Sequence, residues 1–246
     1  MIENILILAA GKGTRLLPLT QDVPKPLLKI DCENTTILGR LISQCNQYFP
    51  KVPIYVNVSY LSEKFFEAAL AIPLDMRPTF LYEKEVLGPA KTLTQFSKLR
   101  NGRNLVIHGD LVLSNNGFMK FAEFALHSSS QMLVCHKRSK SMARSEVKIS
   151  PIDGKMLSIS ERNNSLNFGA SEGEEISTVS SGIFIINSEN LSQFQAIQGE
   201  SLAPRLLNFV NIDALEIFIW DDWRFAVDSI STLQLVKLKL SSDLAN

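Results

Sequence analysis

Residues 5–13 read Ile5-Leu6-Ile7-Leu8-Ala9-Ala10-Gly11-Lys12-Gly13, an unbroken apolar run that ends in two closely spaced glycines. Hydrophobicity that is continuous rather than alternating indicates a strand covered on both faces, as in a parallel sheet. Glycines directly after such a strand let the backbone approach a ligand and turn several N–H groups toward one anion. The stretch therefore predicts a buried strand that leads into an anion-binding loop.

Strand and helix patterns alternate from this first strand to residue 110. The further predicted strands are 54–58, 79–82 and 104–108, and the predicted helices are 36–49, 62–72 and one that begins at Pro89. Proline is a favourable residue in the first turn of a helix. The alternation predicts an α/β fold with a doubly wound, mostly parallel mixed sheet of the Rossmann-like type, connected by right-handed crossovers.

The second half of the chain has a different pattern. Short strands are predicted at 131–136, 146–150, 156–160, 179–186 and 214–220, with two short helices before the last of these. The polar stretch 162–175 is rich in turn residues and predicts a loop. The chain ends in a helix from about Ser229. We expect one domain over residues 1–246, with a small β-rich lobe at about 137–186 within it.

Composition narrows the classes of function. The 246 residues carry 25 basic and 25 acidic side chains, so the balance favours no nucleic-acid partner. Three cysteines (Cys32, Cys45 and Cys135) are widely spaced and form no CxxC pair, which is typical of reduced thiols in a cytoplasmic protein. No signal peptide and no apolar stretch approaching the ~20 residues of a membrane span are recognised. We therefore expect a cytoplasmic protein with no membrane partner.

The first loop carries two cations but does not match the familiar phosphate motifs. Leu16 stands where the dinucleotide fingerprint needs its third glycine, and the P-loop pattern is missing. Arg15 offers a planar fork for phosphate oxygens, and Lys25 lies between two prolines that stiffen the backbone beneath it. Each feature alone would favour a solvated surface loop. Their combination after a buried strand, where α/β folds bind ligands, favours a phosphate site.

The stretch 8–28, LAAGKGTRLLPLTQDVPKPLL, resembles the signature of the sugar-phosphate nucleotidylyltransferases, a family of GT-A-like fold. Members join a nucleoside triphosphate to a sugar 1-phosphate and release pyrophosphate. The resemblance implies a Mg²⁺-dependent transferase of sugar nucleotide biosynthesis, including precursors of cell-surface polysaccharides. It makes the β-rich lobe a sugar-binding lobe, and the expected partners are the two substrates. A homo-oligomer is compatible with the sequence.

The resemblance also assigns the nucleotide side of the site. It implies that Arg15 holds the triphosphate, that Lys25 neutralises charge on the reacting phosphates and that Asp110, in a Gly-Asp pair after a predicted strand, binds Mg²⁺. The Leu-Gly-Pro-Ala turn at 87–90 is similar to the family's Leu-Gly-Thr-Ala turn, with proline as a departure. The implied nucleotide contacts are Ala9, Ala10, Gly11, Lys12, Gly13, Thr14 and Gly88.

The matches on the sugar side are weaker. Ser160-Glu161-Arg162 resembles a glutamate–lysine pair that contacts the sugar and its phosphate, with arginine in place of lysine, and Ser180 and Gly182 match the border of the sugar pocket. Asp228 matches the second metal aspartate. The glycine–threonine–proline that usually follows it is replaced by Ser229-Ile230-Ser231-Thr232, so Asp221 and Asp222 remain competing candidates.

The chemistry of such a reaction asks for the same residue types. In-line attack on the α-phosphorus concentrates negative charge, which hard-oxygen-bound Mg²⁺ and basic side chains offset, and the ionised phosphate needs no protein nucleophile or general base. Less specific interpretations remain for single residues: Asp110 as a strand end, Glu161 as an exposed turn residue, and Asp228 as a polar residue before a helix whose N-cap is Ser229. Trp220 and Trp223 are interpreted as packing residues.

Two other functions stay open. The acceptor could be phosphocholine or another phosphorylated alcohol, used by a cytidylyltransferase, although the glycine at Gly88 favours a sugar. The protein could also be a catalytically silent nucleotide binder, as the changes at Pro89, Arg162 and after Asp228 suggest. The intact set of Arg15, Lys25 and Asp110 argues for activity.

Overall fold

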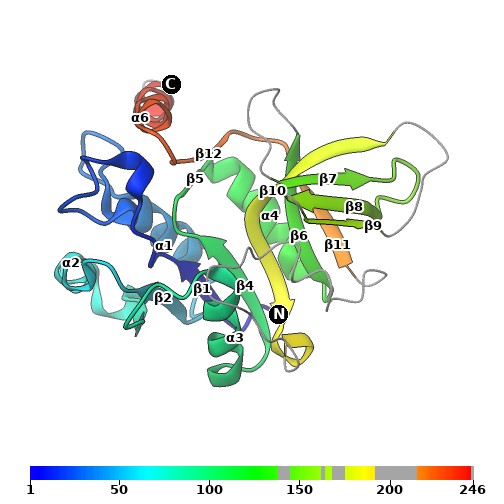
Figure 1. Ribbon diagram of the computed structural model, residues 1–246, viewed down its shortest axis with the longest axis horizontal. Coiled ribbons are helices and arrows are strands. Elements are labelled where there is room, and N and C mark those ends of the chain that lie inside the picture. Colours follow the sequence, from blue (N-terminus) through cyan, green and yellow to red (C-terminus); the bar gives the residue numbers. More distant parts are fainter. Residues whose placement is uncertain (138–144, 162–163, 168–174, 192–214, 245–246) are drawn as a thin grey trace. The chain divides into compact units, whose positions relative to one another are not determined.

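The computed structural model describes residues 1–137, 145–161, 164–167, 175–191 and 215–244 (Figure 1). The chain divides into two compact units, each assembled from separate segments. We call the unit made of Ile2–Val86, Ile107–Ala122 and Asp222–Asn246 the terminal unit. The other, made of Met1, Leu87–Val106 and Glu123–Asp221, is the central unit. The predicted lobe at 137–186 falls within the central unit.

The terminal unit is built on three parallel strands in the order β3-β2-β1 (Figure 1). They are β1 (Asn4–Leu8), β2 (Ile54–Val58) and β3 (Thr79–Tyr82). Ile5, Leu6 and Ile7 of β1 are buried, as the unbroken apolar run there predicts, and all five residues of β2 are buried as well. The connecting helices are α1 (Ile37–Tyr48) and α2 (Ser62–Ala69). Helix α1 begins where the Thr36 hydroxyl accepts a hydrogen bond of 3.0 Å from Gly39 N, a normal N-cap.

A second group of elements completes the terminal unit. Strand β5 (Leu111–Leu113) pairs antiparallel with β12 (Arg224–Ala226), and helix α6 (Ile230–Leu244) follows β12. One apolar cluster joins them to the first loop and to α1. Its buried members are Leu16, Leu28, Ile30, Ile37, Val112, Val227, Leu233, Val236 and Leu240. Trp223 packs against the cluster, in agreement with its interpretation as a packing residue.

The central unit is mainly antiparallel, with the strand order β11-β6-β10-β7-β8-β9. Its strands are β6 (Gln131–Lys137), β7 (Ser145–Ile149), β8 (Met156–Glu161), β9 (Asn164–Asn167), β10 (Ile176–Asn187) and β11 (Leu215–Trp220). Strand β11 runs parallel to β6, and α3 (Pro89–Leu99) belongs to the same unit. The division between units falls within β4 (Arg103–His108) and within α4 (Asn115–His127).

The predicted α/β class with a mixed sheet is confirmed, and the strand at 54–58 is found with the predicted ends. One prediction is wrong: the expected loop at 162–175 contains β9. Strand β8 offers backbone N–H and C=O groups along its free edge, and β9 pairs with it antiparallel from Ser158↔Asn167 to Glu161↔Asn164. Backbone pairing therefore overrides the turn-rich composition there. The two predicted short helices before residue 214 fall largely outside the described residues.

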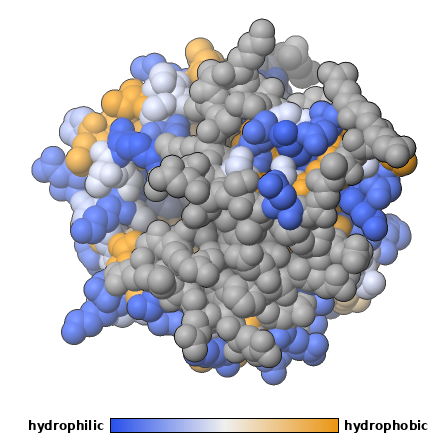
Figure 2. All heavy atoms as spheres, turned by 45° about the vertical axis from the view of Figure 1, so that its right-hand side comes forward, coloured by the Kyte–Doolittle hydropathy of each residue, from blue (hydrophilic) through white to orange (hydrophobic). Residues whose placement is uncertain are grey.

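No helix within the described residues is long and apolar enough to cross a membrane. On the face shown in Figure 2, hydrophilic residues predominate among the coloured ones, and hydrophobic residues lie between them in small groups. This mixed surface is typical of folded domains, in which isolated apolar side chains are common.

Candidate active site

The glycine loop after β1 is closed by contacts with the segment that carries Lys25. Gly13 has a φ of 64°, in the left-handed region that glycine adopts readily, and it precedes a short 3-10 helix at Thr14–Leu16. Its carbonyl accepts a hydrogen bond of 2.9 Å from the Thr20 hydroxyl. A Cβ at Gly13 would lie 3.0 Å from the Cβ of Lys25. Glycine therefore lets the loop and the Lys25 backbone approach each other closely.

Gly109 joins the end of β1 to Asp110. Its N–H donates a hydrogen bond of 2.9 Å to the Leu8 carbonyl. A Cβ at this position would lie 2.7 Å from the same oxygen, a backbone atom that cannot move without shifting β1. The glycine of the Gly-Asp pair is thus required by packing.

We expect Gly109→Ala to lower the free energy of unfolding by about 1–3 kcal/mol, because overpacking forces backbone shifts. Urea unfolding of the purified variant measures this. Gly11→Ala is the matched control, since a Cβ there meets nothing within 4 Å and its effect should stay within about 0.5 kcal/mol. Equal unfolding midpoints for the two variants would show that β1 can shift to accommodate the added Cβ without loss of stability, and would contradict the prediction.

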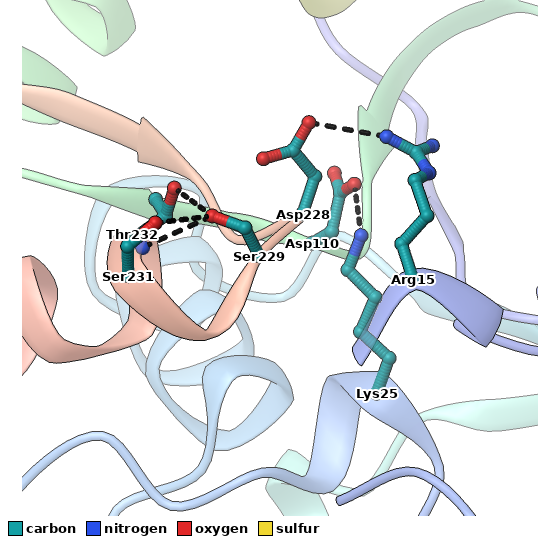
Figure 3. A network of polar contacts seen from close by, with 7 residues as sticks. All are labelled: Arg15, Lys25, Asp110, Asp228, Ser229, Ser231 and Thr232. Carbon is teal, nitrogen blue, oxygen red and sulfur yellow. Dashed lines mark hydrogen bonds and ion pairs between the residues drawn. The ribbon is translucent and has the colours of Figure 1, made fainter. Parts of the chain in front are cut away.

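Lys25 and Asp110 form the first of two ion pairs (Figure 3). Lys25 opens a short 3-10 helix, Lys25–Leu27, and its Nζ lies 2.7 Å from Asp110 Oδ2, with the side chains 13% and 29% exposed. Burial alone would raise the pKa of Asp110, but the charges of Lys25, His108 and Arg224 and the hydrogen bond from Lys25 outweigh it, so the pKa lies below its ordinary value. Asp110 is therefore a carboxylate at neutral pH.

Arg15 and Asp228 form the second pair. Arg15 Nη1 lies 3.1 Å from Asp228 Oδ2, and the side chains are 56% and 21% exposed. Figure 3 shows Arg15 and Lys25 approaching the two aspartates from the first loop and the segment after it. Val227 N donates a hydrogen bond of 2.9 Å to the Asp110 carbonyl, so Asp228 follows directly on a backbone contact with Asp110. The structure thus brings together the four predicted residues, which come from three widely separated stretches of the sequence.

The residues after Asp228 cap the last helix. Ser229 Oγ accepts a hydrogen bond of 3.1 Å from Thr232 N, and the hydroxyls of Ser231 and Thr232 lie 2.9 and 2.8 Å from it (Figure 3). The interpretation of Ser229 as the N-cap therefore holds. It does not compete with a role for Asp228, since the carboxylate of Asp228 faces Arg15 while the cap is made by its neighbour.

Asp222, a competing metal candidate, is engaged elsewhere. Its Oδ2 accepts a hydrogen bond of 2.8 Å from Asn116 Nδ2, and its Oδ1 accepts one of 2.7 Å from Trp223 N. These contacts, opposed by desolvation, lower the pKa of Asp222. They tie the turn before β12 to the start of α4, which is a structural role.

A comparison of Asp228→Asn with Asp222→Asn tests this assignment. We expect Asp228→Asn to lower kcat/KM by about 100-fold, the scale seen when one group that stabilises charge is removed. Asp222→Asn should stay within about 3-fold of the wild type and cost about 1 kcal/mol of stability through its weakened hydrogen bonds. Steady-state kinetics and thermal unfolding of both variants give the answer. A larger loss of kcat/KM in Asp222→Asn than in Asp228→Asn would instead assign the role of active-site carboxylate to Asp222.

The carboxylate oxygens of Asp110 and Asp228, both in the terminal unit, fit a magnesium ion. Among the described residues, no group of three or more His, Cys, Asp or Glu side chains forms a complete protein cage for a metal. Mg²⁺ in phosphate-handling enzymes instead takes one or two carboxylates and completes its shell with water and substrate phosphate oxygens. Asp110 and Asp228 offer such carboxylates, and the low pKa of Asp110 keeps that ligand ionised.

The remaining predicted residues belong to the central unit. Gly88 is the N-cap of α3 with a φ of 87°, and Gly182 has a φ of 76° within β10. Gly182 lies between Ser180 and Phe184, where the pairing of β10 with β6 shifts register. Glu161 is the last residue of β8, opposite Ser145 of β7. Arg162 lies outside the described residues.

Sequence reasoning missed several polar neighbours of the site. Arg224, in β12, is largely buried, which lowers its pKa to about 10 against the opposing effect of Asp110. Asn57 and Glu83 are buried polar residues at the ends of β2 and β3. The signal for Asn57 was present in the sequence, because it is a lone amide in the otherwise apolar run of β2. Nothing local pointed to Arg224.

Comparison with known proteins places this geometry in context. The chain is 30% identical over 113 residues to the bifunctional protein GlmU of Methanococcus maripaludis, covering 46% of this chain and 26% of that protein. It is 32% identical over 126 residues to mannose-1-phosphate guanyltransferase 2 of Candida glabrata, covering 48% and 33%. It is 29% identical over 117 residues to 2-aminoethylphosphonate cytidylyltransferase of Lancefieldella rimae, covering 46% and 44%. The chain thus spans less than half the length of these relatives.

Solved structures share the fold. The crystal structure of HddC from Yersinia pseudotuberculosis in complex with GMP-PN aligns with a TM-score of 0.70 at 20% identity, covering 97% of this chain and all of that one. The model of the nucleotidyl transferase family matches residues 4–201, which is most of the chain and includes Arg15, Lys25 and Asp110. The glycine loop, Arg15, Lys25 and Asp110 thus lie in the part of the chain that matches the family model, and the fold agrees with that of the solved structure. The chain belongs to the nucleotidyl transferase family.

Proposed function

We propose that this protein joins a nucleoside triphosphate to a sugar 1-phosphate, releasing pyrophosphate and an NDP-sugar. The observation that carries the proposal is the pair of contacts Lys25–Asp110 and Arg15–Asp228, which gathers two cations and two carboxylates at the end of the glycine loop. Such a set suits the polyanionic transition state of phosphoryl-type transfer. The acceptor class is supported by the relative named mannose-1-phosphate guanyltransferase 2. The sugar contacts that the sequence resemblance implies, Glu161, Arg162, Ser180 and Gly182, support it as well.

In the proposed reaction an oxygen of the sugar phosphate forms a bond to the α-phosphorus of the triphosphate. The bond from the α-phosphorus to the bridging oxygen of the β-phosphate breaks, and its electron pair leaves with pyrophosphate. The attacking oxygen carries no proton to be removed, so no side chain acts as a general base. The chemical task of the protein is therefore to align the two phosphates and to offset their charge.

Each basic residue has a distinct part in this task. Lys25 is mostly buried, and its backbone is stiffened by Pro24 and Pro26, so its ammonium can meet the α-phosphate repeatably. Arg15 is more exposed and presents a fork suited to the oxygens of the leaving β- and γ-phosphates. Backbone N–H groups of the loop from Gly11 to Thr14 add donors for the triphosphate.

Asp110 and Asp228 would hold Mg²⁺. When bound, the ion supplies Lewis-acid stabilisation of charge on the phosphate oxygens. The two aspartates also hold Lys25 and Arg15 near the same place, so the carboxylates orient the cations as well as offering ligands.

A panel that crosses ATP, GTP, UTP, CTP and dTTP with hexose, hexosamine and heptose 1-phosphates in the presence of Mg²⁺ tests the proposal. Release of pyrophosphate with at least one pair is the expected result. Binding of a triphosphate without turnover by any pair would favour the catalytically silent alternative. A wild-type protein that binds none of the five triphosphates would overturn the proposal.

A second acceptor class has support from one relative. The similarity to a 2-aminoethylphosphonate cytidylyltransferase favours a phosphonate or phosphorylated alcohol used with CTP. Adding 2-aminoethylphosphonate and phosphocholine to the CTP row of the panel separates the two classes. Turnover with either, and none with any sugar 1-phosphate, would replace the sugar by the smaller acceptor.

A further inference from the structure

Three buried polar groups link the ends of the parallel strands of the terminal unit. Ala9 follows β1, Asn57 lies in β2 and Glu83 follows β3, and these residues are 3%, 4% and 6% exposed. The strands around them are apolar. A buried amide or carboxylate lowers stability unless it is hydrogen-bonded, so we expect these residues to have hydrogen-bond partners and a specific structural or functional role.

Hydrogen bonds connect Ala9, Asn57 and Glu83 in a continuous chain, which we call the relay. Ala9 N–H donates to Asn57 Oδ1 at 2.6 Å, and Asn57 Nδ2 donates to Glu83 Oε1 at 2.9 Å. The backbone N–H of Glu83 donates to the Val58 carbonyl at 2.8 Å, which holds Glu83 beside β2. The chemistry of the neighbours determines the orientation of the amide: a backbone N–H requires an oxygen, and a carboxylate requires a donor.

The relay acts on one particular peptide group. Leu8 C=O and Ala9 N–H belong to the same planar peptide, and each is engaged: the carbonyl by Gly109 N at 2.9 Å and the N–H by Asn57. The plane of the Leu8–Ala9 peptide is thereby held on both sides. It is the peptide by which the chain leaves β1, two residues before Gly11, and its partner Gly109 precedes Asp110.

We propose that Asn57 and Glu83 are positioning residues, which set the direction in which the chain enters the triphosphate-binding loop. The proposal rests on the proposed function for the identity of the ligand. Neither residue needs to touch the triphosphate. Loss of the relay would leave the Leu8–Ala9 peptide held by Gly109 alone and give it more freedom to rotate. The N–H groups of Gly11 and Gly13 would then spend less time in the orientation that binds phosphate.

The direct test is triphosphate binding by Asn57→Leu and Glu83→Leu. Isothermal titration with each of the five triphosphates of the panel, with Mg²⁺, should show dissociation constants raised by about tenfold, on the scale of one buried hydrogen bond. The double variant should bind no more weakly than Asn57→Leu alone, because the two residues act as one unit. Glu83→Gln retains an oxygen that can accept from Asn57 and should bind within about 3-fold of the wild type.

Asn57→Asp tests whether the hydrogen bond that Asn57 donates to Glu83 is needed, because aspartate has nearly the same size and shape but lacks that donor. Aspartate keeps the acceptor for Ala9 N–H but faces Glu83 with a second carboxylate, so its binding should be weakened as in the leucine variant. Phe121→Leu, a substitution in the aromatic cluster with Phe49 and Phe118, is the control for general destabilisation and should leave triphosphate affinity unchanged. In each variant that turns over, the KM for the acceptor should change less than that for the triphosphate.

The outcomes are distinguishable. If the wild type binds a triphosphate and Asn57→Leu binds it equally well, the relay proposal is wrong while the proposed function stands. If Asn57→Leu does not fold, Glu83→Leu and Asn57→Asp decide by the same comparison. Equal weakening in Phe121→Leu would reduce the relay to a contribution to stability and overturn the proposal. Failure of the wild type to bind any triphosphate would remove the proposed function itself.

Discussion

Asp110→Asn should slow turnover by about 100- to 1,000-fold while leaving the fold intact. The substitution keeps the shape of the side chain and its ability to accept the hydrogen bond from Lys25 Nζ at 2.7 Å. It removes the negative charge, and with it both a hard anionic ligand for Mg²⁺ and the electrostatic partner of Lys25. The loss should appear in kcat as well as in kcat/KM, because the charge acts on the transition state.

The measurement is single-turnover and steady-state release of pyrophosphate at saturating Mg²⁺. Asp75→Asn, the same chemical change at an exposed position of a short 3-10 helix, is the matched control and should behave as the wild type. Circular dichroism and thermal unfolding confirm that both variants are folded. Wild-type turnover by Asp110→Asn would exclude Asp110 from the mechanism and leave it as the residue that ends a strand.

Lys25→Met has the second large expected effect, a loss of about 100- to 1,000-fold in kcat. The methionine side chain can fill the space of the mostly buried lysine stem, so packing is retained while the ammonium is lost. The loss should fall on the chemical step more than on triphosphate KM, because Arg15 and the loop backbone still hold the other phosphates. Lys25→Arg should recover little, since a planar fork does not reproduce a compact ammonium between two prolines.

Lys29→Met is the control for Lys25→Met. Lys29 lies four residues along the same segment and is exposed, so the same change there should leave the kinetics unaltered. Pyrophosphate release by the three variants and the wild type, measured with the pair of substrates that the panel identifies, gives the comparison. Unchanged kcat in Lys25→Met would return the Pro-Lys-Pro segment to a purely structural role.

Much of the fold could be predicted from the chain because its signals are local. The apolar run at 54–58 forms the strand with the predicted ends, and Pro89 begins its helix as expected. Prediction failed where the pairing of two strands, rather than the composition of one, decides the structure, although β8 and β9 are neighbours in the sequence. The polar residues of β9 form a strand only because β8 offers them a free edge, and nothing in their own composition favours it.

The candidate site divides in the same way. The glycine loop, Arg15, Lys25 and Asp110 could be singled out because a long, specific stretch carries most of them and a Gly-Asp pair after a strand carries the last. Arg224 could not, since its burial and its electrostatic interaction with Asp110 arise only in the fold. Asn57 was visible as an amide in an apolar strand, but the positioning role that we propose for it depends on Ala9 and Glu83, which directly follow two other strands.

By itself the sequence determined the residue types on which the proposed chemistry depends: a glycine loop after a buried strand, two cations near it, and the aspartates that we propose as ligands of a divalent ion. The zero net charge of the whole chain was also a property of the sequence. The structure shows that the four charged residues of the site balance one another as two ion pairs, Arg15–Asp228 and Lys25–Asp110. Only the tertiary structure decided which aspartate meets which cation. Arg15 and Asp228 are 213 positions apart, and their contact exists because a β-strand pair and a capped helix return the end of the chain to its beginning.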